Sequence, residues 1–224
     1  MADSVLTEVS SPRPLKIPKL EKACEVSSSK EDDLRYGTWE DDEYLRQYLQ
    51  FYYQYHKTEG FTIDWDQFDF FMNTRSLDRA RPLSKTKSNA ERIHEQTLFA
   101  IEKHNEATVA KLVFVEHIEA NYKYVAGLLY WLTFWARDVS SSTPESKIYQ
   151  AKVWRRGTEF QIPIFRLKPT EQEIDSIEVQ PPSPMRDFEN PPIMFSRAGP
   201  EDGVPFVFDR TGAGFDPDYY CSSP

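Results

Sequence analysis

One segment limits the possible folds more than any other, because residues 88–167 contain a single helical pattern followed only by extended segments. The helix begins at Ser88-Asn89-Ala90-Glu91, which has the spacing of a capping box, so the serine and glutamate side chains can satisfy amides of the first turn. Asn105 is a candidate for a left-handed residue that ends the helix. Between these ends, one helical stripe carries Ile93, Thr97, Ala100, Ile101 and His104.

Four extended segments follow this helix, and alternate residues of a strand lie on the same face. Gly127 lies in the tight connection between the first two segments, where glycine adopts a positive φ without steric cost. One helix followed by an antiparallel meander predicts an α+β fold, with the helix packed on one face of a curved antiparallel β-sheet. The segments are residues 111–122, 128–137, 148–154 and 160–167.

The alternation also predicts which side chains share a face of the sheet. In the first segment one face carries Leu112, Phe114, Ile118, Ala120 and Tyr122, with Glu116 interrupting. In the second segment one face carries Leu128, Tyr130, Leu132, Phe134 and Ala136, and the other carries Leu129, Trp131, Thr133 and Trp135.

The residues before this unit divide into two parts. Residues 1–35 are mostly polar and carry three prolines, which predicts a disordered N-terminal tail. Residues 36–87 predict an aromatic-rich helical extension and a linker. Residues 40–55 lack glycine and proline, and a helix there would end near Gly60. Its aromatic face comprises Tyr44, Tyr48, Phe51, Tyr52 and Tyr55.

Two further segments complete the expected organisation around a compact unit at residues 88–169. Residues 61–65 alternate and predict a short strand, whereas residues 72–87 are basic and irregular and predict a linker. Residues 170–224 predict a Pro-rich, largely disordered C-terminal tail, because nine of the 16 prolines lie from Pro181 onward. The aromatic residues of this tail are unusual for a linker and would stick locally or dock on a partner: Phe188, Phe195, Phe206, Phe208, Phe215, Tyr219 and Tyr220.

Composition excludes several classes of partner and compartment. The net charge of −9 argues against a nucleic-acid partner, since phosphate binding needs clustered cations. No stretch of about 18 apolar residues exists, so no membrane partner is expected. Cys24 and Cys221 do not make a disulfide framework, and the first 25 residues do not resemble a secretory signal. We therefore expect a cytoplasmic or nuclear protein.

No arrangement of side chains predicts catalysis, a metal site or a cofactor. Asp64 and Asp66 flank Trp65, but no nucleophile, base or glycine-rich phosphate loop accompanies them. The histidines at positions 56, 94 and 117 are scattered without ligand spacing. We therefore expect a protein that is not an enzyme and needs no cofactor.

Three sequence motifs resemble plant cystatins. The helix contains Phe-Ala-Ile-Glu-Lys-His-Asn at 99–105, which is similar to the helix signature of that family. Residues 124–133, Tyr-Val-Ala-Gly-Leu-Leu-Tyr-Trp-Leu-Thr, and residues 149–154, Tyr-Gln-Ala-Lys-Val-Trp, resemble its strand motifs in the same order. The preceding segment, with Tyr-Leu-Arg-Gln-Tyr at 44–48 and Glu-Gly-Phe-Thr-Ile-Asp at 59–64, also resembles the extension of cystatin-related proteins of crucifer plants. The resemblance covers roughly residues 90–168 and implies a cystatin-like domain at 88–169.

The resemblance implies a cysteine-type endopeptidase inhibitor that occludes the active site of a papain-like protease. Cystatins insert a wedge made of a glycine-bearing N-terminal trunk, a Gln-x-Val-x-Gly hairpin and a Pro-Trp hairpin. In this chain Lys123 stands at the Gln place, the second hairpin has neither Pro nor Trp, and the trunk glycine is missing. These departures imply weakened inhibition. By resemblance, the protease-binding residues are Lys123, Tyr124, Val125, Ala126 and Gly127, with Arg155, Arg156, Gly157 and Thr158.

Alternatives remain for each of these features. Residues 125–127 also fit a plain turn, and Arg155 with Arg156 fits either a solvated hairpin tip or a grip on an acidic partner. Trp131 and Trp135 would form an exposed patch in a minimal domain; either the helix at 40–55 or the tail covers them, or they form an intermolecular interface. The alternative function is a non-inhibitory protein-binding module on a cystatin scaffold, whose partner is another protein.

Overall fold

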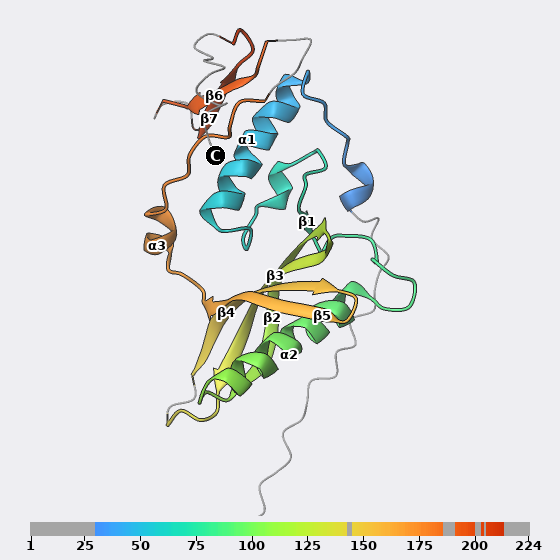
Figure 1. The fold of residues 1–224 in the computed structure, drawn as a ribbon, viewed down its shortest axis with the longest axis vertical. Coiled ribbons are helices and arrows are strands. Elements are labelled where there is room, and N and C mark those ends of the chain that lie inside the picture. The colour runs from blue at the N-terminus through green and yellow to red at the C-terminus, as the bar shows by residue number, and fades with distance from the viewer. Residues whose placement is uncertain (1–29, 143–144, 186–190, 200–202, 204, 213–224) are drawn as a thin grey trace, which may run out of the picture.

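The computed structural model describes residues 30–142, 145–185, 191–199, 203 and 205–212. A five-stranded antiparallel sheet in the order β1-β2-β3-β4-β5 forms its centre, with the longest helix, α2, across one face (Figure 1). We call this the inner face and the opposite one the outer face. Within the described residues, no helix has the length and apolar character needed to span a membrane. The sheet and its helix comprise β1 (Arg75–Ser76), α2 (Asn89–Ala107), β2 (Leu112–Val125), β3 (Gly127–Asp138), β4 (Ser146–Arg156) and β5 (Glu159–Leu167).

Helix α2 begins as predicted and ends later than predicted. The capping box of Ser88 and Glu91 is formed in both directions. Asn105 is still helical, and its side chain accepts from the amide of Leu112 and donates to the carbonyl of the same residue, both at 2.9 Å. The prediction of a left-handed stop at Asn105 is therefore wrong, because this side chain joins the helix to β2 instead. The predicted stripe packs on the sheet through Ile93, Thr97, Ala100 and Ile101, all buried, and through half-buried His104, which stacks on Phe165 at 4.1 Å.

The four predicted strands are confirmed as β2 to β5, and the inner face of β3 is the one predicted. The prediction for β2 fails at Ile118, which is 43% exposed. Register shifts at 114/116 and at 117/119 insert an extra residue twice, so that His117, not Ile118, lies opposite Phe134. The inner-face core consists of Leu77, Ile93, Ala100, Ile101, Leu112, Ala120, Tyr122, Tyr130, Leu132, Phe134, Ala136, Ala151 and Val153.

The aromatic extension covers the outer face. Its helix α1 (Asp42–Lys57) confirms the predicted helix, and Tyr55 contacts Trp131 edge to face at 5.8 Å. Trp131 is fully buried, and a Cβ on Gly60 would lie 2.9 Å from its ring, so the extension covers this tryptophan as one alternative expected. Trp135 remains half-buried. Residues 61–65 form no strand; they run into a short 3-10 turn at Trp65–Gln67, and the strand prediction is wrong there.

The predicted linker at 72–87 contributes to the sheet. Arg75 and Ser76 pair with Tyr122 and Asn121 as strand β1, and Leu77 is fully buried in the inner-face core. The sequence did not predict this strand, because the segment is basic and a two-residue strand forms only through its pairing with β2. The N-terminal tail prediction lies largely outside the described residues, but its end is fixed, because the Glu31 carboxylate contacts Arg75 at 3.3 Å and accepts from the Arg81 amide at 2.8 Å.

The described parts of 170–224 are more ordered than predicted. They contain α3 (Glu171–Asp175) and a hairpin of β6 (Met194–Arg197) and β7 (Phe206–Asp209). The hairpin lies beside α1 (Figure 1). Phe195 and Phe206 are buried in one cluster with Leu45 and Leu49 of α1, so these aromatic residues of the tail pack within the chain. Each strand of this hairpin has four residues, and α1 supplies the apolar surface that so short a hairpin needs. Cys24, Phe188, Phe215, Tyr219, Tyr220 and Cys221 lie outside the described residues.

Candidate protein-binding site

Two neighbouring hairpin turns form one end of the sheet. We call residues 123–127 the first tip and residues 155–158 the second tip. Gly127 has φ +114°, and a Cβ there would lie 2.3 Å from the carbonyl oxygen of Arg155. The indole Nε1 of Trp154 donates to the carbonyl oxygen of Ala126 at 3.1 Å. Close backbone packing and this hydrogen bond therefore hold the two tips beside each other.

The first tip presents apolar side chains to solvent. Tyr124 is 60% exposed and Val125 is 42% exposed, while Ala126 is also exposed. The ring of Tyr124 rests edge-on against Tyr122 at 5.6 Å, which supports it from the inner side. Lys123 is half-buried and has no ion-pair partner among the described residues. A supported apolar tip of this kind suits insertion into a cleft.

The second tip is polar and carries no aromatic side chain. Arg156, Gly157 and Thr158 are exposed, and a Cβ on Gly157 would meet nothing within 4 Å. Arg155 turns toward α2, where its guanidinium lies 5.0 Å from the centre of the Phe160 ring and 3.8 Å from the Glu95 carboxylate. The structure thus brings all nine predicted residues to one end of the sheet, with Arg155 held on the inner side.

The segment that enters β1 is covered by the extension. Phe70 and Met72 are buried in a cluster with Phe51 of α1, and Phe71 is half-buried. A chain end that precedes the first strand of the sheet is therefore not free to protrude beside the tips. Residues 68–72, Phe-Asp-Phe-Phe-Met, are mostly apolar, a signal of burial that the sequence prediction did not use.

A groove lies beside the first tip. It has a volume of about 420 Å³, and its wall includes the exposed side chains of Tyr36 and Tyr124 together with buried Tyr122 and half-buried Arg75. Arg75 is engaged by Glu31 and also lies over the Phe71 ring at 4.7 Å. Tyrosine and arginine are enriched at protein interfaces, so this groove extends the surface that a partner of the first tip would meet.

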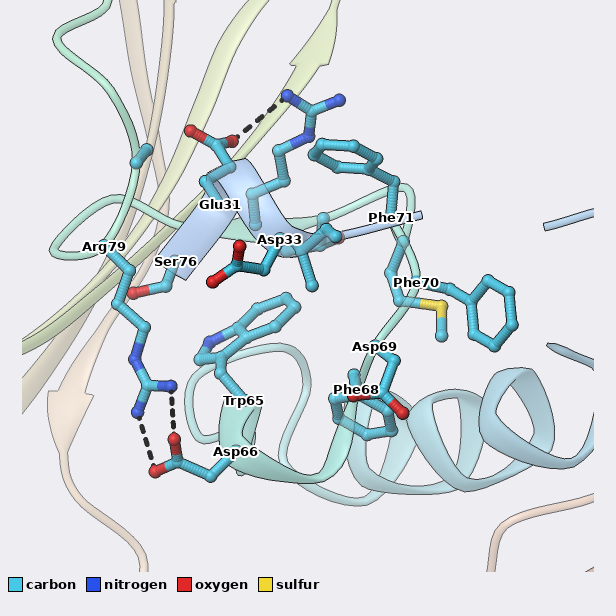
Figure 2. A pocket seen from close by; sticks show the side chains of 15 residues that line it. Glu31, Asp33, Trp65, Asp66, Phe68, Asp69, Phe70, Phe71, Ser76 and Arg79 are labelled. Carbon is cyan, nitrogen blue, oxygen red and sulfur yellow. Dashed lines mark hydrogen bonds and ion pairs between the residues drawn. The ribbon is translucent and has the colours of Figure 1, made fainter. Parts of the chain in front are cut away.

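A second cavity, of about 290 Å³, lies between the extension, the end of the N-terminal segment and β1, and no residue of either tip lines it (Figure 2). Trp65 and Phe68 form an aromatic wall, and carboxylates surround it. Its two guanidinium groups are both engaged: Arg79 binds Asp66 through two contacts of 3.0 and 3.2 Å, and Arg75 binds Glu31. The first pair joins the extension to the segment that follows β1, and the second joins β1 to the end of the N-terminal segment, so both pairs have a structural role.

The acidic residues and histidines that the sequence analysis considered as candidates for catalysis or metal binding make structural contacts in the fold. Asp64 accepts from the amide of Asp66 at 3.3 Å and from Gln67 at 2.7 Å, so it caps a turn. His117 contacts Asp78 at 2.7 Å. In the part of the chain that the structure describes, no group of three or more His, Cys, Asp and Glu side chains is placed to hold a metal ion.

Comparison with known proteins shows what the central domain is similar to. A family model described as Cystatin domain matches residues 82–163. Multicystatin of Solanum tuberosum is 36% identical over 66 residues, which are 30% of this chain and 8% of that protein. Cystatin-1 of Zea mays is 32% identical over 80 residues, which are 36% of this chain and 56% of that protein. The matches thus span at most about half of these relatives. Together with the fold, they show that the chain contains a plant cystatin-like domain.

Proposed function

We propose that the chain binds a papain-like cysteine protease through the first tip and inhibits it more weakly than a cystatin with a complete wedge. The observation that supports this most directly is the exposed apolar tip formed by Tyr124, Val125 and Ala126 ahead of Gly127, whose backbone leaves no room for a side chain. The cystatin-like domain and the names of its relatives support the class of partner. Occlusion of a cleft involves no bond-making step, so no catalytic residue is needed.

Three features favour weak inhibition. Lys123 would bring a cation without an intramolecular partner toward an apolar cleft, and desolvating it costs free energy unless the protease supplies a carboxylate. The second tip has no aromatic anchor, because Trp154 faces the first tip. The segment before β1 is packed against α1 through Phe70 and Met72.

The test is titration of papain activity with the purified full-length chain and two matched variants. Val125→Glu places a carboxylate in the first tip, and Val139→Glu makes the same change beyond the other end of β3, at a residue that is 49% exposed. We expect micromolar inhibition by the wild type, an increase of about tenfold or more in the inhibition constant for Val125→Glu, and no change for Val139→Glu. If both variants inhibited papain equally weakly, the first tip would not be the part that binds the protease.

The second candidate function is a protein-binding module that does not inhibit. The covered segment before β1 favours this candidate. The residues that precede the first strand, where a cystatin has its N-terminal trunk, pack against the extension and are not available to a protease. Papain with an alkylated active-site cysteine separates the candidates when its binding is measured by biosensor. Binding that Val125→Glu weakens, without inhibition of active papain, would support the module. Absence of binding and of inhibition would contradict the proposed protease partner for papain.

A further inference from the structure

We propose that the two tips form a basic docking surface that selects a partner whose cleft is rimmed by carboxylates. This inference rests on the proposed function, because it specifies the partner of the same tips. Its central part is the apolar first tip, and its rim is a set of cations that the fold gathers from three separate segments. The cations are Lys87, Arg92, Lys123, Arg155 and Arg156.

On the inner side, several cations share one carboxylate. Lys87 contacts the Oε2 atom of Glu95 at 2.7 Å, and Arg155 contacts the same atom at 3.8 Å. The hydrogen bond from Lys87, assisted by the charges of Arg155 and Arg92, holds the pKa of Glu95 below its usual value. One carboxylate cannot neutralise these groups, so this side of the tips keeps positive charge.

On the outer side, two cations have no counter-ion. Neither Lys123 nor Arg156 has an ion-pair partner among the described residues, and Arg156 is exposed at its tip. In the strand register, Lys123 lies opposite Leu129 of β3, and Arg156 lies opposite Glu159 of β5. Arg156 and Glu159 form no ion pair with each other. Cations therefore flank the apolar tip on both faces of the sheet.

This surface contrasts with the chain as a whole, whose net charge is −9. Besides Glu95, the carboxylates near the tips are Glu91, which accepts from Ser88 in the capping box, Glu159, and Glu31, which is paired with Arg75 in the groove. A local excess of cations on an acidic protein orients that protein when it meets an acidic partner. The rest of the chain repels the partner, whereas the tips attract the carboxylates at the rim of its cleft. An apolar centre with a charged rim is also the usual anatomy of an interface.

The test compares two charge forms of one protease. Papain is used as purified and after succinylation of its surface lysines, which converts each cation into a carboxylate. We expect succinylated papain to associate about tenfold faster with the full-length chain at about 0.15 M salt, where repulsion from the distant negative charges of the chain is screened, with an advantage that falls as more salt is added. Equal association rates for the two forms, with no salt dependence, would overturn the inference.

A pair of charge-matched variants locates the effect. Lys123→Glu with Arg156→Glu reverses two cations at the tips, and Lys111→Glu with Lys147→Glu reverses two exposed cations at the opposite end of the sheet. Both double variants have the same net charge. We expect only the tip variant to lose the about tenfold advantage with succinylated papain. Equal losses in both would show that net charge alone acts, and would overturn a local surface.

A second measurement keeps the inference testable if papain does not bind. A polyglutamate octapeptide is titrated into the isotope-labelled full-length chain at low salt, and backbone amide shifts are followed by NMR. We expect the largest shifts at the two tips and at Lys87. Shifts confined to the N-terminal segment that carries Arg13, Lys16 and Lys19, or to the far end of the sheet around Lys111, would overturn the inference, whatever the outcome with the protease.

Discussion

The two faces of the sheet are covered in different ways. The inner face receives α2, which immediately precedes β2 in the chain, and the contact is mainly apolar around Tyr130 and Leu132, although α2 also buries Gln96 and Thr97 there. The outer face receives a loop that lies about sixty residues earlier than the strand it touches, and the contact depends on one buried amide, Asn121, and one buried indole, Trp131. The contact on the inner face therefore follows from residue patterns that are local in the sequence, whereas the contact on the outer face depends on hydrogen bonds between distant residues.

Asn121 explains why the outer contact has a single geometry. It is fully buried, and its amide nitrogen donates to the carbonyl oxygens of Gly60 at 3.0 Å and Phe61 at 3.2 Å. Its carbonyl oxygen accepts from the indole Nε1 of Trp65 at 2.8 Å. Buried polar groups destabilise a fold unless they are bonded, so a loop that is shifted along the sheet would leave these groups without partners. The ion pair between Glu59 and Arg166 adds a further link to β5.

The largest expected effect comes from Trp131→Ala. Removing a fully buried tryptophan should lower the free energy of unfolding by about 4 kcal/mol and open the space below Gly60 and Tyr55. Urea unfolding followed by circular dichroism measures the loss. Hydrogen exchange should show the greatest loss of amide protection in the loop at 58–63, because this loop sits on the indole.

Leu132→Ala is the control for that variant, since Leu132 follows Trp131 in β3 and is fully buried on the inner face. We expect a loss of about 3 kcal/mol, with amide protection falling in α2 rather than in the loop at 58–63. If both variants lowered protection equally in both places, the two faces would unfold as one unit and the comparison between them would fail.

A smaller loss is expected for Asn121→Ala. The variant leaves the carbonyl groups of Gly60 and Phe61 without their donor, and it should cost about 2 kcal/mol. Asn105→Ala removes an amide that also makes two hydrogen bonds to the backbone, on the side of α2, and should cost about 1 kcal/mol because that site is only half-buried. Limited proteolysis should cut the loop at 58–70 faster in the Asn121 variant alone.

The inner face could be predicted from the sequence because its signals are local. The capping box at Ser88 and the alternation along β3 each depend on residues a few positions apart. Ile118 could not be placed, because the bulges of β2 arise from its pairing with β3. The hairpin β6–β7 was missed for a similar reason, since its stability depends on α1, more than a hundred residues away.

The position of the candidate site could be predicted from the sequence, but the contacts of its side chains could not. An antiparallel meander brings alternate turns to one end, so the two tips had to be neighbours once the four strands were placed. The hydrogen bond from Trp154 to Ala126 and the sharing of Glu95 by Lys87 and Arg155 depend on side-chain directions that no spacing encodes. The burial of Phe70 and Met72 likewise required the extension to be seen in place.

The smallest expected effect is a difference in pH dependence between the two faces. Glu119 lies under the extension, where burial, with a smaller contribution from Asp78, raises its pKa despite hydrogen bonds from the Ile63 amide and Asn121. On the inner face, partial burial lowers the pKa of His104. The two groups therefore respond to acid with opposite signs.

A raised carboxyl pKa means that folding favours the protonated form, so the contribution of Glu119 is complete below its unfolded pKa and is lost as the pH rises through the folded one. Glu119→Gln keeps the acceptor without the charge, and should match the wild type near pH 4 and exceed it in unfolding free energy at pH 7. The lowered pKa of His104 acts oppositely: its contribution is present above the unfolded value and is lost as the pH falls, so His104→Gln should gain on the wild type only in acid. Urea unfolding of the three proteins at both pH values measures this. If Glu119→Gln gained nothing at pH 7, the outer contact would hold a charged carboxylate at no cost, and the contrast between the faces would lie in their packing alone.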